Sequence, residues 1–350
     1  MHCTSIKKSG KLPDIFLHLA NDDRKAILDK AAHDSGKGAN VLEKDVWVCW
    51  TLEKLVAMPG VPPLAFKGGT SLSKVYNAIA RFSEDVDVTL DRRALDSKLD
   101  PFADKSRTQR KKDCDALDAL LNQMLTEQIK PYFDECLRAE LGDKNLASKF
   151  GENHGQLVIP YPSCFDRGGA YMPESILLEL GGKNSIEPAI EHELSSYLES
   201  HVPSVEYPKS KVPVLTAERT FWEKATLVHA ECNRPKVREN VDRMSRHWYD
   251  LAQLSKGAVG TSAMDDKTLL EDVVTQKNTL YYSGFANYEE CLTGGLRLVP
   301  DESLANALGE DFGRMEADGM FWQPPGDFSD ILAQLGQIEA EINEKFTNLK

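Results

Sequence analysis

The stretch FKGGTSLSKVYNAIARFSEDVDVTL, residues 66–90, decides how we interpret this chain of 350 residues. It joins a glycine pair, Gly68 and Gly69, through a helical run to a strand that carries Asp85 and Asp87. Residues two apart on a strand point to the same face, so the two carboxylates would lie side by side. Like charges that close are unfavourable unless a divalent cation lies between them, so we predict that Asp85 and Asp87 bind Mg²⁺. The glycines upstream would let backbone N–H groups approach an anion such as phosphate.

Either feature alone has an ordinary explanation, because Asp-x-Asp is usually a solvated strand end and Gly-Gly is usually a turn. Their order and helix-length spacing resemble the nucleotidyltransferase signature: Gly-Gly or Gly-Ser, a short helix, then Asp-h-Asp/Glu-h, where h is apolar. The resemblance implies a cradle for the β- and γ-phosphates of a nucleotide, made by Gly68, Gly69, Thr70 and Ser71. The segment differs from a P-loop, because no Gly-Lys-Ser/Thr follows the glycines.

The composition limits the class of protein. The chain is 41% hydrophobic, enough for a real core, and has no apolar run long enough to span a membrane. Its N-terminus, MHCTSIKKSGKLPDIFLHLA, lacks a long apolar segment and a convincing cleavage site, so we do not expect export. The 7 cysteines are scattered without a C-x-x-C pair, which fits reduced thiols in the cytoplasm and signals neither a zinc site nor a disulfide framework.

The charge of the chain bears on its partners. A formal net charge of −13 argues against a protein that coats nucleic acid broadly. A local basic cluster, KSRTQRKK at residues 105–112, is nevertheless present. It could contact the phosphates of a nucleic acid, or it could be a solvated loop or helix start.

Apolar periodicity and turn residues predict the organisation of the chain. We expect a catalytic core with N-terminal helices over residues 1–205 and a mostly helical C-terminal domain over 206–350. The polar, proline-containing segment 203–213 would be the loop between them. The predicted strands are 63–66, 86–90, 156–160 and 175–180. The predicted helical segments are 12–32, 41–58, 70–80, 113–141, 219–231, 243–254, 269–274, 288–292, 302–315 and 328–346.

Three further residues are candidates for the same site. Glu179 is a lone acid in an apolar strand, where burial is unfavourable without a partner, so we predict that it is a third metal carboxylate. The alternative is an edge strand with Glu179 facing water. Lys224 lies beside the apolar stripe of a helix and could neutralise a triphosphate in a cleft. Asp250 lies four residues after Arg246 on a predicted helix, and a surface ion pair with Arg246 is its simpler explanation.

Four blocks, FKGGTSLSKVY, RFSEDVDVTL, ERTFWEKATLVHAE and SRHWYDLAQL, resemble in this order the AbiEii/AbiGii toxin family of nucleotidyltransferases. The segments LEKDVWVCWTLEKL and DFGRMEADGMFWQPPGDFSDILAQLGQIEAEIN extend the resemblance to roughly residues 40–345. The family pattern implies metal acids at Asp85 and Asp87. It implies an essential lysine at Lys224 and a later aspartate at Asp250. It also implies an α/β (α+β) fold, in which a DNA-polymerase-β-like mixed sheet with flanking helices precedes a helical domain that contributes these last two residues to the cleft.

The resemblance further implies the reaction and the partners. The enzyme would depend on Mg²⁺ or Mn²⁺, transfer a nucleotide from an NTP to an acceptor hydroxyl, and release pyrophosphate. Such proteins are toxins of toxin–antitoxin systems of the abortive-infection type, a form of phage defence, so a cognate antitoxin is expected. Some relatives modify the 3′ end of tRNA, which makes tRNA the expected acceptor. Three alternatives stay open: transfer to a protein hydroxyl, modification of a sugar or drug, and a non-catalytic module that binds NTP or antitoxin.

Overall fold

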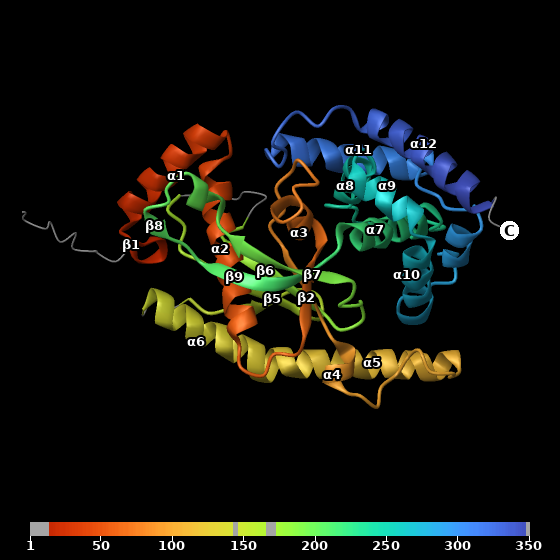
Figure 1. Ribbon diagram of the computed structural model, residues 1–350, viewed down its shortest axis with the longest axis horizontal. Coiled ribbons are helices and arrows are strands. Elements are labelled where there is room, and N and C mark those ends of the chain that lie inside the picture. The colour runs from red at the N-terminus through yellow and green to blue at the C-terminus, as the bar shows by residue number, and fades with distance from the viewer. Residues whose placement is uncertain (1–13, 143–145, 166–172, 348–350) are drawn as a thin grey trace, which may run out of the picture.

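The computed structural model describes residues 14–142, 146–165 and 173–347 (Figure 1). The N-terminal segment considered for export, Cys3 and the first residues of the predicted helix 12–32 fall partly or wholly outside the described residues. The strands are β1 (Asp14–Ile15), β2 (Leu64–Lys67), β3 (Val86–Leu90), β4 (Lys149–Phe150), β5 (Gln156–Pro160), β6 (Ser175–Gly181), β7 (Ala189–Ser195), β8 (Val205–Glu206) and β9 (Lys209–Leu215).

Helices surround these strands. The α-helices are α1 (Asn21–Ser35), α2 (Ala39–Ala57), α3 (Gly68–Lys74), α4 (Arg92–Leu95), α5 (Arg107–Met124), α6 (Lys130–Leu141), α7 (Ala217–Cys232), α8 (Ser245–Ser255), α9 (Ala258–Asp265), α10 (Lys267–Leu280), α11 (Glu302–Ala317) and α12 (Phe328–Thr347). A π-helical turn, η2 (Leu125–Ile129), joins α5 to α6, and 3₁₀ turns are η1 (Phe16–His18), η3 (Tyr197–Ser200) and η4 (Tyr288–Leu292).

Seven strands form one mixed sheet in the order β4-β5-β6-β3-β2-β9-β7. The central strand β3 runs antiparallel to β2 and parallel to β6. Val86, Val88 and Leu90 are buried and alternate with Asp87, which therefore lies on the opposite face of the strand. The alternation that suggested a strand from sequence thus also sets the direction of the acidic side chain.

Two hydrophobic clusters organise the chain. The first joins α2 to the sheet and to α6, with Trp50 packed against Phe133 at a ring-centroid distance of 6.1 Å. The second is built by α7–α12 together with Leu72 and Ile79, which follow the glycine turn. Figure 1 shows α5 and α6 along one side of the sheet and α7–α12 gathered at one end of the molecule. The segment after the glycine turn therefore connects the sheet to the helical part.

The structure confirms the fold class and corrects several boundaries. The predicted strands 86–90 and 156–160 coincide with β3 and β5. The predicted helix 70–80 is wrong in its length, because α3 ends at Lys74. The predicted loop 203–213 is also wrong: it contains β8 and most of β9, and β9 hydrogen-bonds between β2 and β7. The domain boundary after residue 205 stays a prediction. Strand β9, which follows it, pairs with strands of the sheet. Among the described residues, every helix is too short or too polar to span a lipid bilayer.

Candidate active site

The glycine pair forms a strand-to-helix turn, because β2 runs directly into α3 at Gly68. Gly68 has a φ of 80°, a left-handed conformation that favours glycine, and a Cβ there would collide with the Asp87 carboxylate. A Cβ on Gly69 would lie 2.7 Å from both Arg81 Nη2 and Ser83 Oγ. Only a turn without side chains fits here, so bare backbone lies directly against the carboxylate.

The hydroxyls of Thr70 and Ser71 hold this turn in place. Thr70 Oγ1 donates a hydrogen bond of 2.5 Å to the Asp85 carbonyl oxygen, and Ser71 Oγ donates one of 2.9 Å to the Gly68 carbonyl oxygen. Both side chains are buried. Of the four predicted cradle residues, Gly68 and Gly69 therefore line the adjacent cavity, whereas the two hydroxyl residues lie behind them.

Asp87 and Glu179 lie side by side, because β3 and β6 pair in parallel with these two residues in register. β6 lies between β5 and β3, which excludes the edge-strand alternative for Glu179. Burial first, and then the neighbouring Asp87, raise the pKa of Glu179 to about 7. The Gln156 amide donates a hydrogen bond to Glu179. Among the described residues, neither carboxylate forms an ion pair with a lysine or arginine.

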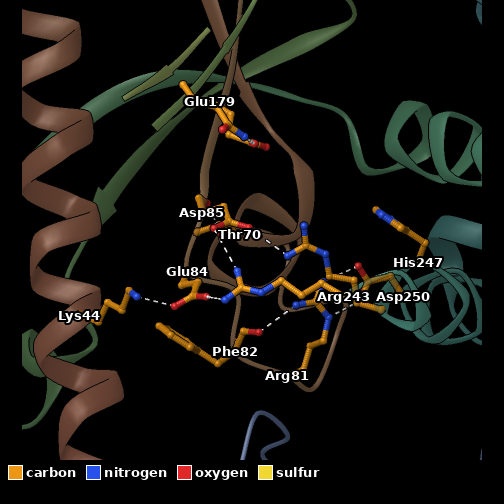
Figure 2. Close-up of polar contacts among 12 residues, drawn as sticks. Lys44, Thr70, Arg81, Phe82, Glu84, Asp85, Glu179, Arg243, His247 and Asp250 are labelled. Atoms are coloured by element: carbon orange, nitrogen blue, oxygen red, sulfur yellow. Dashed lines mark hydrogen bonds and ion pairs between the residues drawn. The ribbon is translucent and has the colours of Figure 1, made fainter. Parts of the chain in front are cut away.

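Asp85 lies in a different environment from the one that the sequence suggests. The strand begins one residue after Asp85, whose carbonyl oxygen accepts a hydrogen bond from Thr70. The carboxylate is buried and accepts a hydrogen bond of 3.0 Å from Arg246 Nη1, while Arg243 Nη1 lies 3.9 Å away (Figure 2). Burial would lower the pKa of Arg246, but Asp85 and Asp87 raise it above its ordinary value, so the guanidinium stays charged.

A second acid extends this group of charges toward α2. Glu84 is buried, accepts from Lys44 of α2, and lies 2.8 Å from Arg243 Nη2. Lys44 also donates to the Pro173 carbonyl oxygen at 2.9 Å. Figure 2 shows Lys44, Glu84 and Arg243 in a row that ends beside Asp85.

Lys224 and Asp250, the two residues that the resemblance assigns to the cleft, lie in contact. Asp250 is 0% exposed and accepts two hydrogen bonds of 2.7 Å from Arg81. Lys224 Nζ lies 2.9 Å from the same carboxylate. Burial alone would raise the pKa of Asp250, but Arg81 and Lys224 hold it well below its ordinary value. The surface pair with Arg246 is therefore excluded.

His247 completes this group on the helical side. Its Nδ1 lies 3.5 Å from Lys224 Nζ. Burial, and then the charges of Lys224 and Arg246, lower the pKa of His247 well below its ordinary value, which keeps the imidazole neutral. Burial lowers the pKa of Lys224 and Asp250 opposes that shift, so the ammonium depends on the carboxylate for its charge.

A cavity of about 310 Å³ lies between the sheet and the helices, a size that suits a small ligand. Among the residues that line it are Gly68, Gly69, Asp87, Glu179, Lys224, Arg246, His247 and Lys277. Asp85 instead borders a second, more open cavity of about 510 Å³, with Glu84 and Arg243. The structure thus brings Asp87, Glu179, the glycines and Lys224 to one cavity and places Asp85 at the other.

Sequence reasoning missed Arg81 and misassigned Arg246. Arg81 is 1% exposed and is the main partner of Asp250. A signal in the sequence was its position inside the motif, four residues before Asp85. Arg246 was considered only as a partner of Asp250 on the same helix, because helical spacing reports local neighbours and cannot report a contact with Asp85.

Two of the three predicted metal ligands, Asp87 and Glu179, are placed so that they could bind a divalent cation together. Within the described part of the chain, the adjacent carboxylates of Asp87 and Glu179 form no ion pair with a lysine or arginine, and carboxylate oxygens are the preferred ligands of Mg²⁺. The part of the chain that the structure describes contains no group of three or more His, Cys, Asp or Glu side chains arranged to hold a metal ion. Asp85 would join the other two only if its pairing with Arg246 opened.

Comparisons with known proteins identify the family of this chain. Residues 50–334 match the model of the family described as nucleotidyl transferase AbiEii toxin, type IV TA system. No curated protein matches the chain. Among solved structures, the chain is similar to MenT4, a nucleotidyltransferase toxin from Mycobacterium tuberculosis H37Rv, with a TM-score of 0.49 and 14% identity over 94% of this chain and 93% of that chain. Since the family model spans most of the sequence and includes the glycine turn and the acids, the chain belongs to the AbiEii family of nucleotidyltransferase toxins of type IV toxin–antitoxin systems.

Proposed function

We propose that this nucleotidyltransferase transfers a nucleotide from an NTP to the 3′-terminal hydroxyl of tRNA. The observation that supports it best is the single cavity shared by the glycine turn, the Asp87–Glu179 pair and Lys224. Backbone donors, uncompensated carboxylates and a buried ammonium are the groups that nucleotidyl transfer requires around a triphosphate. The acceptor oxygen would bond to the α-phosphorus as pyrophosphate leaves.

Each residue has a role that follows from its position. The N–H groups at the start of α3, exposed by Gly68 and Gly69, would donate to the β- and γ-phosphates, with Thr70 and Ser71 fixing the turn. Lys224 would offset phosphate charge. Asp250 raises the pKa of Lys224 against the effect of burial and would hold its ammonium group in position.

We propose that Asp87, Glu179 and Asp85 hold Mg²⁺ or Mn²⁺. A divalent ion there would neutralise phosphate charge and make the acceptor hydroxyl more acidic. Asp87 and Glu179 already lie side by side. Asp85 needs Arg246 to move, and an incoming phosphate would give the Arg246 guanidinium another anion to bind.

The basic cluster 105–112 supports a nucleic-acid acceptor. Its residues begin α5, where Lys111 and Lys112 are exposed. The Arg107 guanidinium lies 3.5 Å from the ring centroid of Tyr282, and the neighbouring Tyr281 lines the cavity. The cluster therefore lies near the rim of the cavity, where the backbone of a tRNA acceptor arm could pass.

The family supplies the remaining partner and context. An antitoxin is the expected inhibitor of a type IV toxin. The cysteines of the described residues, Cys49, Cys114, Cys136, Cys164, Cys232 and Cys291, are free thiols. Free thiols support the proposed cytoplasmic location, where reducing conditions hold. We propose that the toxin acts there in phage defence of the abortive-infection type.

The test is transfer of label in vitro. Purified protein is incubated with Mg²⁺, each α-labelled NTP in turn and total tRNA, beside Asp87→Asn and a matched control, Glu191→Gln, whose carboxylate is exposed on β7 of the same sheet. We expect label in tRNA, lost by roughly a hundredfold or more in Asp87→Asn and unchanged in Glu191→Gln. The same result is expected for Asp85→Ala, provided that it folds.

Other outcomes identify the alternatives. Label in a protein would indicate nucleotidylation of a protein hydroxyl. Label in a small alcohol would indicate a drug- or sugar-modifying enzyme. NTP binding without any pyrophosphate release, across tRNA, protein and small-molecule acceptors, would contradict the proposal in favour of a binding module.

A further inference from the structure

The cavity contains more positive charge than the groups described so far require. The cationic side chains that line it are Lys67, Arg81, Lys224, Arg246 and Lys277. Asp250 neutralises Arg81 and Lys224, and Asp85 neutralises Arg246. The two remaining lysines have no carboxylate within 4.0 Å among the residues that the structure describes. Neither of these two ammonium groups is therefore fixed by an ion pair, and both can bind a ligand.

Lys67 and Lys277 come from different parts of the molecule. Lys67 is the last residue of β2 and directly precedes the glycine turn, whereas Lys277 lies on α10 in the helical part. Glu223 of α7 also lines the cavity, but its carboxylate lies 3.4 Å from Arg219 Nε. Burial lowers the pKa of Lys277, Glu223 opposes this shift, and the charge of Lys67 lowers the pKa further.

Lys277 is held toward the cavity by its neighbours. Its Nζ lies 4.9 Å from the centroid of the Tyr281 ring, a cation–π contact. Tyr281 is fixed in turn, because its hydroxyl donates a hydrogen bond of 2.7 Å to Asn184 Oδ1. The ammonium is therefore positioned before any ligand arrives, which lowers the cost of binding.

Two ammonium groups that face one cavity repel each other. Among the residues described, no carboxylate lies within 4.0 Å of either one, although Asp87 lies opposite Lys67 in the β2–β3 ladder and Glu223 raises the pKa of Lys277 from a greater distance. A ligand with one negative charge would satisfy only one of them. A polyphosphate chain could bind both at once, because its neighbouring phosphate groups each carry negative charge. The chemistry of the pair therefore fits consecutive phosphate groups better than a carboxylate or a single phosphate.

We infer that Lys67 and Lys277 bind the β- and γ-phosphates of the nucleotide from two sides of the cavity and thereby select a triphosphate over a monophosphate. The identity of the ligand as an NTP rests on the proposed function. The requirement for a polyphosphate rests only on the two lysines that line the cavity.

The test measures binding separately from turnover. Affinities of the full chain for sodium tripolyphosphate, for α,β-methylene ATP, CTP, GTP and UTP, and for the four nucleoside monophosphates are measured by titration calorimetry. The proteins are wild type, Lys67→Met, Lys277→Met and the double variant. Each single variant should bind triphosphates roughly ten- to hundredfold more weakly, and the double variant more weakly still. Monophosphate affinities should change less than threefold, as an order-of-magnitude bound.

Controls separate binding from folding. Lys267→Met is matched, because Lys267 lies on the same helix α10 but forms a surface pair with Glu271 at 3.9 Å, away from the cavity. It should bind triphosphates like wild type. Lys277→Arg should recover most of the affinity, because it restores the charge. Melting temperatures of Lys67→Met and Lys277→Met should stay close to wild type, since neither ammonium forms an ion pair within 4.0 Å among the residues described.

Each result has a defined meaning. Weaker binding of triphosphates and monophosphates alike would overturn the inference and assign the lysines a structural role. Unchanged triphosphate binding in the double variant would overturn it as well, as would a wild-type protein that binds no polyphosphate. If triphosphate binding depends on the lysines but no acceptor is ever labelled, the inference stands and the proposed function fails.

Discussion

Two regions of this molecule contain buried carboxylates, and they differ in which side chains surround the negative charge. On the helical side, Asp250 is completely buried, and Arg81 and Lys224 hold its pKa below the ordinary value. On the sheet side, Asp87 and Glu179 lie opposite each other on neighbouring strands, and burial with the neighbouring charge raises the pKa of Glu179 to about 7. Among the residues described, Asp250 forms ion pairs with Arg81 and Lys224, whereas neither Asp87 nor Glu179 forms one with a lysine or arginine.

The difference indicates what each region does. A buried carboxylate with two cations can fix the positions of the side chains that it binds, but it has no capacity left for a ligand. Two adjacent carboxylates without a cation lower the stability of the fold and gain most from a metal ion. We therefore expect changes at Asp250 to act first on folding, and changes at Asp87 or Glu179 to act first on ligand binding and turnover.

The largest expected effect is the loss of the Asp250 carboxylate. Asp250→Asn leaves Arg81 and Lys224 buried without their shared anion, which should lower the free energy of unfolding by about 3–5 kcal/mol. Urea denaturation followed by circular dichroism measures this change. Part of the loss should disappear as the pH falls well below 4, because the wild-type pair contributes stability only while Asp250 is ionised.

A surface pair serves as the matched control. Asp242 pairs with Arg314 at 2.8 Å, but its side chain is 61% exposed. Asp242→Asn should change the unfolding free energy by less than about 1 kcal/mol. If Asp250→Asn were no more destabilising than Asp242→Asn, the Asp250 cluster would not be a buried ion-pair network, and the contrast with the sheet side would be lost.

The sheet was predictable from sequence where local pattern decides the structure. Strand β3 follows from the alternation of Val86 and Val88 with acids. β9 was missed because Pro213 argues against a central strand, yet its pairing with β2 is limited to Phe66 and Val214. The ladder with β7 overrides this signal, and in it Pro213 lies opposite Glu191.

The site was predictable only in part. The sequence predicted that Asp87, the glycines and Lys224 share one site, and in the structure they line one cavity. Lys224 also contacts Asp250. Neither pattern nor spacing could show that Arg246 binds Asp85 or that Arg81 binds Asp250, because both contacts join segments far apart in the sequence. Such pairings depend on how the sheet and α8 pack together, which no local rule specifies.

The second prediction compares two glycines with nearly the same φ angle. Gly60 has a φ of 76°, and a Cβ added there would have nothing within 4 Å, whereas a Cβ on Gly68, with a φ of 80°, would meet Asp87. Gly60→Ala should cost about 1 kcal/mol of unfolding free energy through backbone strain alone. Gly68→Ala should cost about 2–3 kcal/mol, since Asp87 must also move.

Activity distinguishes the two glycine variants more sharply than stability does. Because the alanine displaces the carboxylate that we propose binds the metal, Gly68→Ala should lose labelling of tRNA by roughly a hundredfold, and Gly60→Ala should keep it. Equal activities in the two variants would show that the close approach of the turn to Asp87 is not needed for the reaction.

The smallest effect concerns the pH dependence of the sheet side. The pKa of Glu179 is about 7 in the folded protein, above its ordinary value of 4.5. The folded state therefore binds this proton more tightly than the unfolded state, and its stability falls as the pH rises and the proton is lost. The metal-free wild type should therefore lose roughly 1–2 kcal/mol of unfolding free energy relative to Glu179→Gln as the pH rises from about 5 to 8. Urea denaturation in EDTA at several pH values measures the difference.

Mg²⁺ should reverse this trend, because a cation stabilises the ionised pair and binds only the folded state. Millimolar Mg²⁺ should stabilise the wild type more at pH 8 than at pH 5. The gain should be much smaller in Glu179→Gln, which keeps only one carboxylate of the pair. A gain from Mg²⁺ that is the same at both pH values and in both proteins would place the ion elsewhere. In that case the like-charged pair on β3 and β6 would have to be explained by a shared proton alone.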